Sequence, residues 1–102
     1  MRVIFAGKLL NETVLEMFDF SGRLAVGETI TSASTTAITY SGVDASPGAI
    51  VSGAATVVGG KVTQLVTGGV LGVTYLLTCR AHTFANQWLE LSAYLVVVPD
   101  QD

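Results

Sequence analysis

Cys79 and His82 carry the most reactive side chains of this sequence, and they lie three positions apart. A thiol beside an imidazole base can act as a nucleophile, and both side chains are common zinc ligands. On a strand, a spacing of three places the two on opposite faces. The chain has one cysteine and one histidine, too few for a zinc site of three or four such ligands. We therefore expect a buried structural thiol at Cys79 and a solvated strand end at His82.

Carboxylates offer a second chemistry, because a pair held in a cleft can perform acid–base catalysis. Glu12 and Glu16 share one face of a strand but have no partner base, so a solvated face explains them better. The aspartates lack the spacing of a calcium-binding loop. The glycine-rich run 68–72 is followed by neither a helix nor a lysine, unlike a phosphate-binding loop. The sequence therefore predicts no catalytic residue, no cofactor and no metal site.

Length and charge narrow the class of protein. A chain of 102 residues has room for one domain. Charged residues make up 13%, about half the usual share, which suggests that partner proteins cover part of the surface. The net charge is −3 and the five basic residues are scattered, so we expect no nucleic-acid partner.

The compartment can be inferred from the apolar runs and the single cysteine. Residues 3–6 are too short for a signal-peptide core, and residues 94–98 fall far below the roughly 20 residues that span a bilayer. We therefore expect neither export by a signal peptide nor a membrane partner. A lone cysteine forms no internal disulfide, which favours folding in a reducing cytoplasm.

The elements that would position these residues are strands. Residues 88–98 alternate with the two-residue period of a strand, and one face reads Leu89, Leu91, Ala93, Leu95 and Val97. Residues 73–83 alternate likewise, with one face made of Tyr75, Leu77, Cys79 and Ala81. Residues 84–87 predict a hairpin loop between the two, and Gly59-Gly60 predicts a second tight turn. The expected core includes Leu77, Leu89, Leu91 and Leu95.

The front half predicts strands near residues 12–20 and 28–40, with one helical turn at 21–24 between them. A loop at 43–48 precedes a short run at 49–52. With residues 2–6, the count reaches seven or eight short strands, typical of an all-β, immunoglobulin-like antiparallel sandwich. We assign residues 12–102 to this sandwich and residues 1–11 to an N-terminal arm or first strand. Tyr75 is similar to a tyrosine corner, although it precedes Cys79 by four positions rather than two.

Two features suggest protein contacts. Trp88 and Tyr94 lie on the face opposite the leucine row, where they either form a contact or cover a neighbouring loop or sheet edge. The apolar arm is either an ordinary first strand or a strand lent to a neighbouring subunit. The candidate interface residues are Val3, Ile4, Phe5, Phe84, Trp88 and Tyr94.

Four blocks of the sequence carry a resemblance to a known family: residues 18–24, 27–30, 40–47 and 72–79. In this order the chain resembles small immunoglobulin-like virion proteins of tailed bacteriophages, some of them described as fiber–tail adaptors. The resemblance extends from about Glu12 to Asp100. The loop at 84–87 departs from the Ala-Gly-Gln type of turn expected there.

The resemblance implies a non-enzymatic structural protein of the virion. As an adaptor, it would join tail or neck to fibers through symmetric repeated copies, made in the cytoplasm of the host bacterium. Two alternatives stay open. One is a capsid decoration protein on the head lattice, and the other is a carbohydrate-binding module that stacks sugars on Trp88 with Tyr94 or Phe84.

Overall fold

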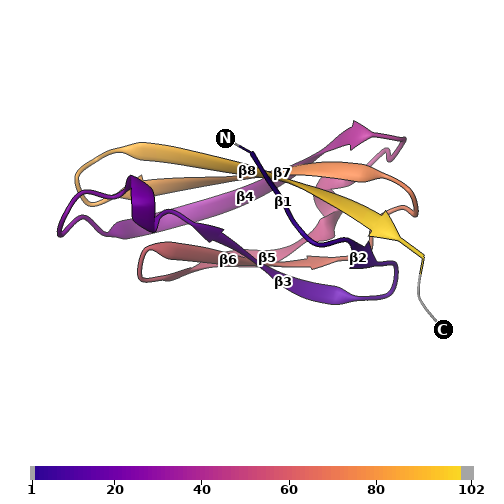
Figure 1. Cartoon of the computed structure of the whole chain (residues 1–102), viewed down its shortest axis with the longest axis horizontal. Helices are drawn as coiled ribbons and strands as arrows, with labels where there is room; N and C mark the ends of the chain where they lie inside the picture. Colours follow the sequence, from indigo (N-terminus) through magenta and orange to yellow (C-terminus); the bar gives the residue numbers. More distant parts are fainter. Residues whose placement is uncertain (1, 100–102) are drawn as a thin grey trace.

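Apolar and polar residues alternate along most of this chain, and the strands that they form pack as two facing sheets (Figure 1). The computed structural model describes residues 2–99, with side chains from Ile4 onward. Apolar side chains from one face of each sheet fill the space between the layers, as in other sandwiches. The predicted all-β sandwich is therefore confirmed.

One sheet has five strands, most of which form the upper layer in Figure 1. Its order is β1 (Arg2–Ile4), β8 (Trp88–Val98), β7 (Thr74–Thr83) and β4 (Ile30–Ser41), while β2 (Lys8–Leu9) pairs farther along β8. The lower sheet has the order β3 (Thr13–Asp19), β6 (Lys61–Thr67) and β5 (Val51–Val58). Two 3₁₀ helices interrupt the strands: η1 (Ser21–Arg23), at the predicted helical turn, and η2 (Pro47–Ile50).

The two predicted hairpins are both confirmed. β7 and β8 are antiparallel neighbours whose register sets Tyr75 opposite Leu95. In their loop, Asn86 has a φ of 65°, a left-handed conformation that asparagine tolerates better than most residues. β5 and β6 are joined by a two-residue turn in which Gly59 has a φ of 61°.

The core lies between the sheets and draws heavily on the predicted inner faces of β7 and β8. Leu77 and Leu95 are completely buried, and Leu89 is almost so. Leu91 was predicted to lie in the core, but it is only half-buried and packs against the margin of the core. β1 pairs with residues 92–94 of β8, so Leu91 lies just beyond the segment that this neighbour covers.

β5 differs from the sequence interpretation, which placed only a short run at residues 49–52. The strand continues to Val58 because a bulge between Ser52 and Thr56 absorbs the break in alternation. Gly53 has a φ of 72° within this bulge. The buried Gln64 donates through Nε2 to the carbonyl oxygens of Ser52 at 3.0 Å and Gly53 at 3.1 Å. A side-chain amide thereby satisfies backbone oxygens that the irregular ladder leaves without strand partners.

Residues 2–9 form short parallel strands against β8 of the same chain, as an ordinary first strand would (Figure 1). Ile4 lies opposite Tyr94 and Lys8 opposite Val97. The Lys8 side chain is buried, and its Nζ donates to the carbonyl oxygens of Leu9 at 2.7 Å and Leu10 at 3.1 Å. The N-terminal segment thus completes one side of the five-stranded sheet.

Candidate protein-contact surface

The outer face of the five-stranded sheet carries an apolar row that crosses four strands. Ile4 on β1 pairs with Tyr94 on β8, Tyr94 pairs with Leu76 on β7, and Leu76 pairs with Ile38 on β4. These four residues, which we call the outer row, point away from the core because they alternate with its inward side chains. Ile4 is 78% exposed and Ile38 is 56% exposed. Leu76 is only 8% exposed, so Ile4, Ile38 and the half-buried Tyr94 supply most of the exposed apolar surface, and such a surface is a feature of protein contact sites.

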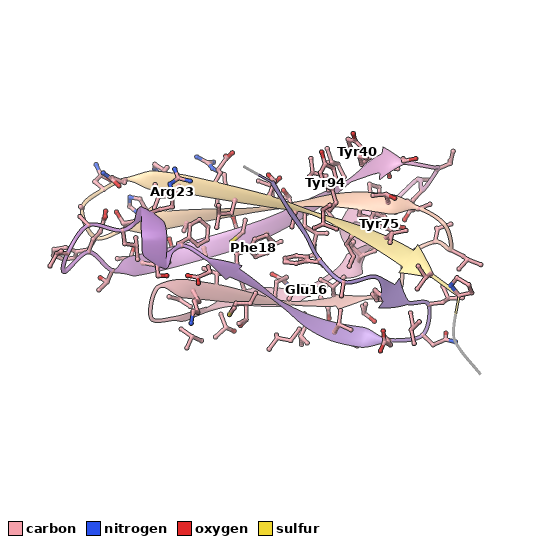
Figure 2. All side chains as sticks on the ribbon, in the orientation of Figure 1. Glu16, Phe18, Arg23, Tyr40, Tyr75 and Tyr94 are labelled. Carbon is pink, nitrogen blue, oxygen red and sulfur yellow. The ribbon has the colours of Figure 1, made fainter. Side chains whose placement is uncertain are left out.

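A hollow of about 330 Å³ opens beside the outer row. It is lined by Ile4, Tyr40, Thr74, Tyr94 and Val96. The rings of Tyr40 and Tyr94 meet edge to face with their centroids 4.6 Å apart, and Figure 2 shows both on the outer side of the sheet. A tyrosine offers an apolar ring and a polar hydroxyl, so this hollow could receive an apolar side chain and also form hydrogen bonds.

A second, more polar cluster lies toward the other end of β8. Trp88 is 57% exposed and pairs with His82, whose ring stacks on the indole with a centroid distance of 4.4 Å. The guanidinium of Arg80 lies 4.7 Å from the centre of the Trp88 ring and bonds Glu90 at 3.1 Å. His82 lies at the end of β7, as predicted, but it is half-buried there and also bonds Asn86. The cross-strand register places it against the indole.

Trp88 and Tyr94, one of the two aromatic pairs considered for sugar binding, do not come together. Trp88 and Tyr94 are six residues apart on one strand, a separation of about 20 Å. The indole packs with His82 and Arg80, whereas Tyr94 packs with Tyr40. Phe84, 79% exposed, lies in the β7–β8 loop. Trp88 and Tyr94 therefore do not form a shared stacking platform.

The arm residues divide between the surface and the core. Ile4 joins the outer row, whereas Phe5 is half-buried and meets Phe18 edge to face at 5.3 Å. Figure 2 shows Phe18 between the two layers. The side chain of Val3 lies outside the described residues. Of the six predicted interface residues, the structure brings Ile4 and Tyr94 together in one surface.

Sequence reasoning missed the contribution of β4 to this surface. Ile38 and Tyr40 extend the apolar outer surface from β8 and β7 onto β4, and both are more than half exposed. The available signal was that Ile38 and Tyr40 are two positions apart within the predicted strand at 28–40, which places both side chains on the same face. The alignment with Tyr94, however, depends on pairing between strands far apart in the sequence.

Burial sets the environment of two titratable side chains, Cys79 and Glu16, while Glu12 stays at the surface. Cys79 is a completely buried free thiol, as predicted, and burial raises its pKa to about 11. Glu16 shares the inward face of β3 with Phe18 and is half-buried, so its assignment to a solvated face is wrong. Burial raises the pKa of the Glu16 carboxyl. Glu12 is exposed and accepts the Leu9 N–H at 2.8 Å.

Neither a metal cluster nor a membrane-spanning helix emerges from the described part of the chain. Within residues 2–99, no three His, Cys, Asp or Glu side chains are grouped as metal ligands. Over the same range, no helix is long and apolar enough to cross a bilayer. The feature that remains is the outer row with its hollow.

This geometry defines the protein as a β-sandwich in which one sheet has an apolar outer face. The chain belongs to the family described as podophage GP4 fiber-tail adaptor protein gp77, whose model matches residues 8–96. No curated protein and no solved structure matches it. The family is one of structural adaptors of phage virions, which is not an enzyme class. The resemblance of the sequence to phage fiber–tail adaptors is therefore confirmed.

Proposed function

We propose that this chain is a non-enzymatic adaptor that joins the tail or neck of a phage particle to its fibers in symmetric repeated copies. The family match over residues 8–96 carries this proposal. The outer row supports it, because an adaptor needs a surface that another virion protein can cover. The low share of charged residues, 13%, is consistent with such coverage.

The hollow at Tyr40 and Tyr94 is the proposed anchor site for a partner side chain. Aromatic residues at the centre of a desolvated contact often dominate binding, and truncation of one can cost about 2 kcal/mol or more. Ile4 and Val96 would exclude water from the edges of the hollow. Trp88 and Phe84, exposed toward the other end of β8, offer a second contact region for another copy or partner.

We also infer that the sandwich is immunoglobulin-like. The order β3-β6-β5 facing β8-β7-β4 corresponds to strands B-E-D facing G-F-C of that fold. The Tyr75 hydroxyl accepts the N–H of Val70, five residues upstream, at 2.8 Å, as a tyrosine corner does. Synthesis in the reducing cytoplasm of the host fits the unpaired, buried Cys79.

Loading of variants into assembling particles tests the contact surface. Ile4→Asp places a charge in the outer row without removing a core side chain, so we expect it to reduce incorporation strongly. Leu65→Asp is the matched control, because Leu65 is exposed on the outer face of the other sheet. Equal loading of wild type and both variants would overturn the assignment of the outer row, and loss of loading with Leu65→Asp alone would move the contact to the three-stranded sheet.

A further inference from the structure

The free edge of β4 differs from every other sheet edge among the described residues. β4 is the last strand of the five-stranded sheet and runs for 12 residues without a charge or a proline. No described residue forms a ladder with its outer side. Alternate residues of such a strand direct their N–H and C=O groups away from the sheet, where they are available to another strand.

The other three edges carry the features that usually prevent pairing between molecules. The β1 and β2 edge is short and broken at residues 5–7. β3 carries Glu16 and Asp19, and β5 contains the bulge at Gly53. Short strands, charges and bulges are the standard protection of sheet edges. On β4 the irregularities lie only near its ends, so residues 32–39 form a regular stretch with no charge, proline or bulge, while β5 and η2 lie close beside the strand.

The side chains of β4 are also complementary to those of a second, antiparallel β4. Along its outer face the strand begins with small residues, Ser32 and Ser34, and ends with large ones, Ile38 and Tyr40. A two-fold axis at Thr36 would place Ser34 opposite Ile38 of the other copy, and Ser32 near Tyr40, which lies at the register shift between Thr39 and Ser41. Each large side chain then meets a small one, and no like charges face each other across the axis.

We propose that two copies of this chain pair through their β4 strands, antiparallel about Thr36, to form one continuous sheet. The two outer rows then extend across the junction, because Ile38 of each copy lies beside the axis. In variable-type immunoglobulin sandwiches further strands of the same chain occupy the corresponding edge, so a strand at this position is compatible with the two-layer fold. This inference goes beyond the adaptor role and does not depend on it.

Sedimentation equilibrium of the purified chain tests the pairing. We expect a concentration-dependent dimer that Thr36→Lys weakens about tenfold or more, since it puts two like charges directly opposite each other. Thr56→Lys, an exposed position on β5, is the matched control and should leave dimerisation unchanged. A cooperative thermal unfolding transition like that of the wild type would show that Thr36→Lys still folds. A strict monomer at all concentrations, or equal dimerisation of wild type and Thr36→Lys, overturns the proposal.

Disulfide trapping tests the register. With a mild oxidant, Thr36→Cys should link to its own counterpart, because residue 36 faces itself across the axis. Ser32→Cys lies on the same face of the same strand but opposite Tyr40, so it should not cross-link. Cys79 is completely buried in both variants and should not compete. Cross-linking of Ser32→Cys as fast as Thr36→Cys, or none with Thr36→Cys, rules out pairing about Thr36.

Discussion

The hydroxyl of Tyr75 donates a hydrogen bond of 2.7 Å to the carboxylate of Asp44, joining the first residues of β7 to the loop that follows β4. The same hydroxyl accepts the N–H of Val70. The bond from Tyr75, followed by that from the Ser46 N–H, lowers the pKa of Asp44. The buried Tyr75 side chain, which Figure 2 shows between the layers, therefore links the loop after β4 to the loop before β7 through hydrogen bonds.

We expect Tyr75→Phe to lower the free energy of unfolding by about 1–3 kcal/mol, because it leaves the Val70 N–H and the Asp44 carboxylate without their shared partner. In the wild type, the Asp44 contribution is present above the ordinary aspartate pKa and is lost as the pH falls through its lowered folded value. Tyr75→Phe should therefore also reduce the loss of stability in acid. Urea unfolding at several pH values measures both effects, and an unchanged acid profile would contradict the linkage.

Leu95→Ala and Leu91→Ala should differ in cost, although both residues lie on the apolar face of β8. Leu95 is completely buried, so its truncation should cost about 2–5 kcal/mol. Leu91 is half-buried beyond the end of β1, so the cost should be clearly smaller. Denaturant unfolding of the two variants provides the comparison. Equal losses would mean that Leu91 is covered as fully as Leu95 in solution.

Glu16→Gln should stabilise the protein at neutral pH, because the raised pKa means that burial disfavours the ionised carboxyl. For this group, wild-type stability is fully present below the unfolded pKa and is lost as the pH rises through the higher folded value. The advantage of the variant should therefore disappear in acid. Thermal unfolding from acid to neutral pH checks this, with the exposed Glu12→Gln as the control. A Glu16→Gln variant that is no more stable than wild type at neutral pH would contradict the burial of the charge.

Cys79 should resist thiol reagents while the protein is folded. Its side chain is completely buried, and a pKa of about 11 leaves little thiolate at neutral pH. The reaction with a chromogenic disulfide reagent should proceed at the rate of unfolding and become fast in denaturant. Because the folded pKa is raised, stability should also fall as the pH rises from the ordinary thiol value toward 11. Rapid labelling in native buffer would show that the thiol is accessible.

The alternation of residues 73–98 was enough to predict the β7–β8 hairpin, its loop and most of its core face. Each of these features depends on local periodicity and on neighbouring strands. β5 was harder to predict, because the break at Gly53 looks like a turn until Gln64 supplies the amide that satisfies the bulge. Glu16 was misassigned because its polarity suggested solvent, whereas its parity with Phe18 directs it inward.

The contact surface could be predicted only in part. Tyr94 and Ile4 were identified as exposed apolar candidates, but their pairing requires a parallel register between the two ends of the chain. Phe5 is as apolar as Ile4, so the sequence treated the two alike, but the Phe5 side chain points inward and contacts Phe18. Ile38 and Tyr40 join the surface through the long-range pairing of β4 with β7. Contacts between strands distant in sequence are set by whole-sheet packing, which local patterns do not encode.

Electron cryomicroscopy of particles that carry a labelled copy of this chain tests the central claim most directly. The adaptor assignment predicts extra density at the junction of tail and fibers, repeated with the symmetry of the tail. The outer face of the five-stranded sheet should lie against a neighbouring virion protein there. Label on the head lattice, as expected of a capsid decoration protein, or only along the shafts or tips of the fibers would contradict the assignment.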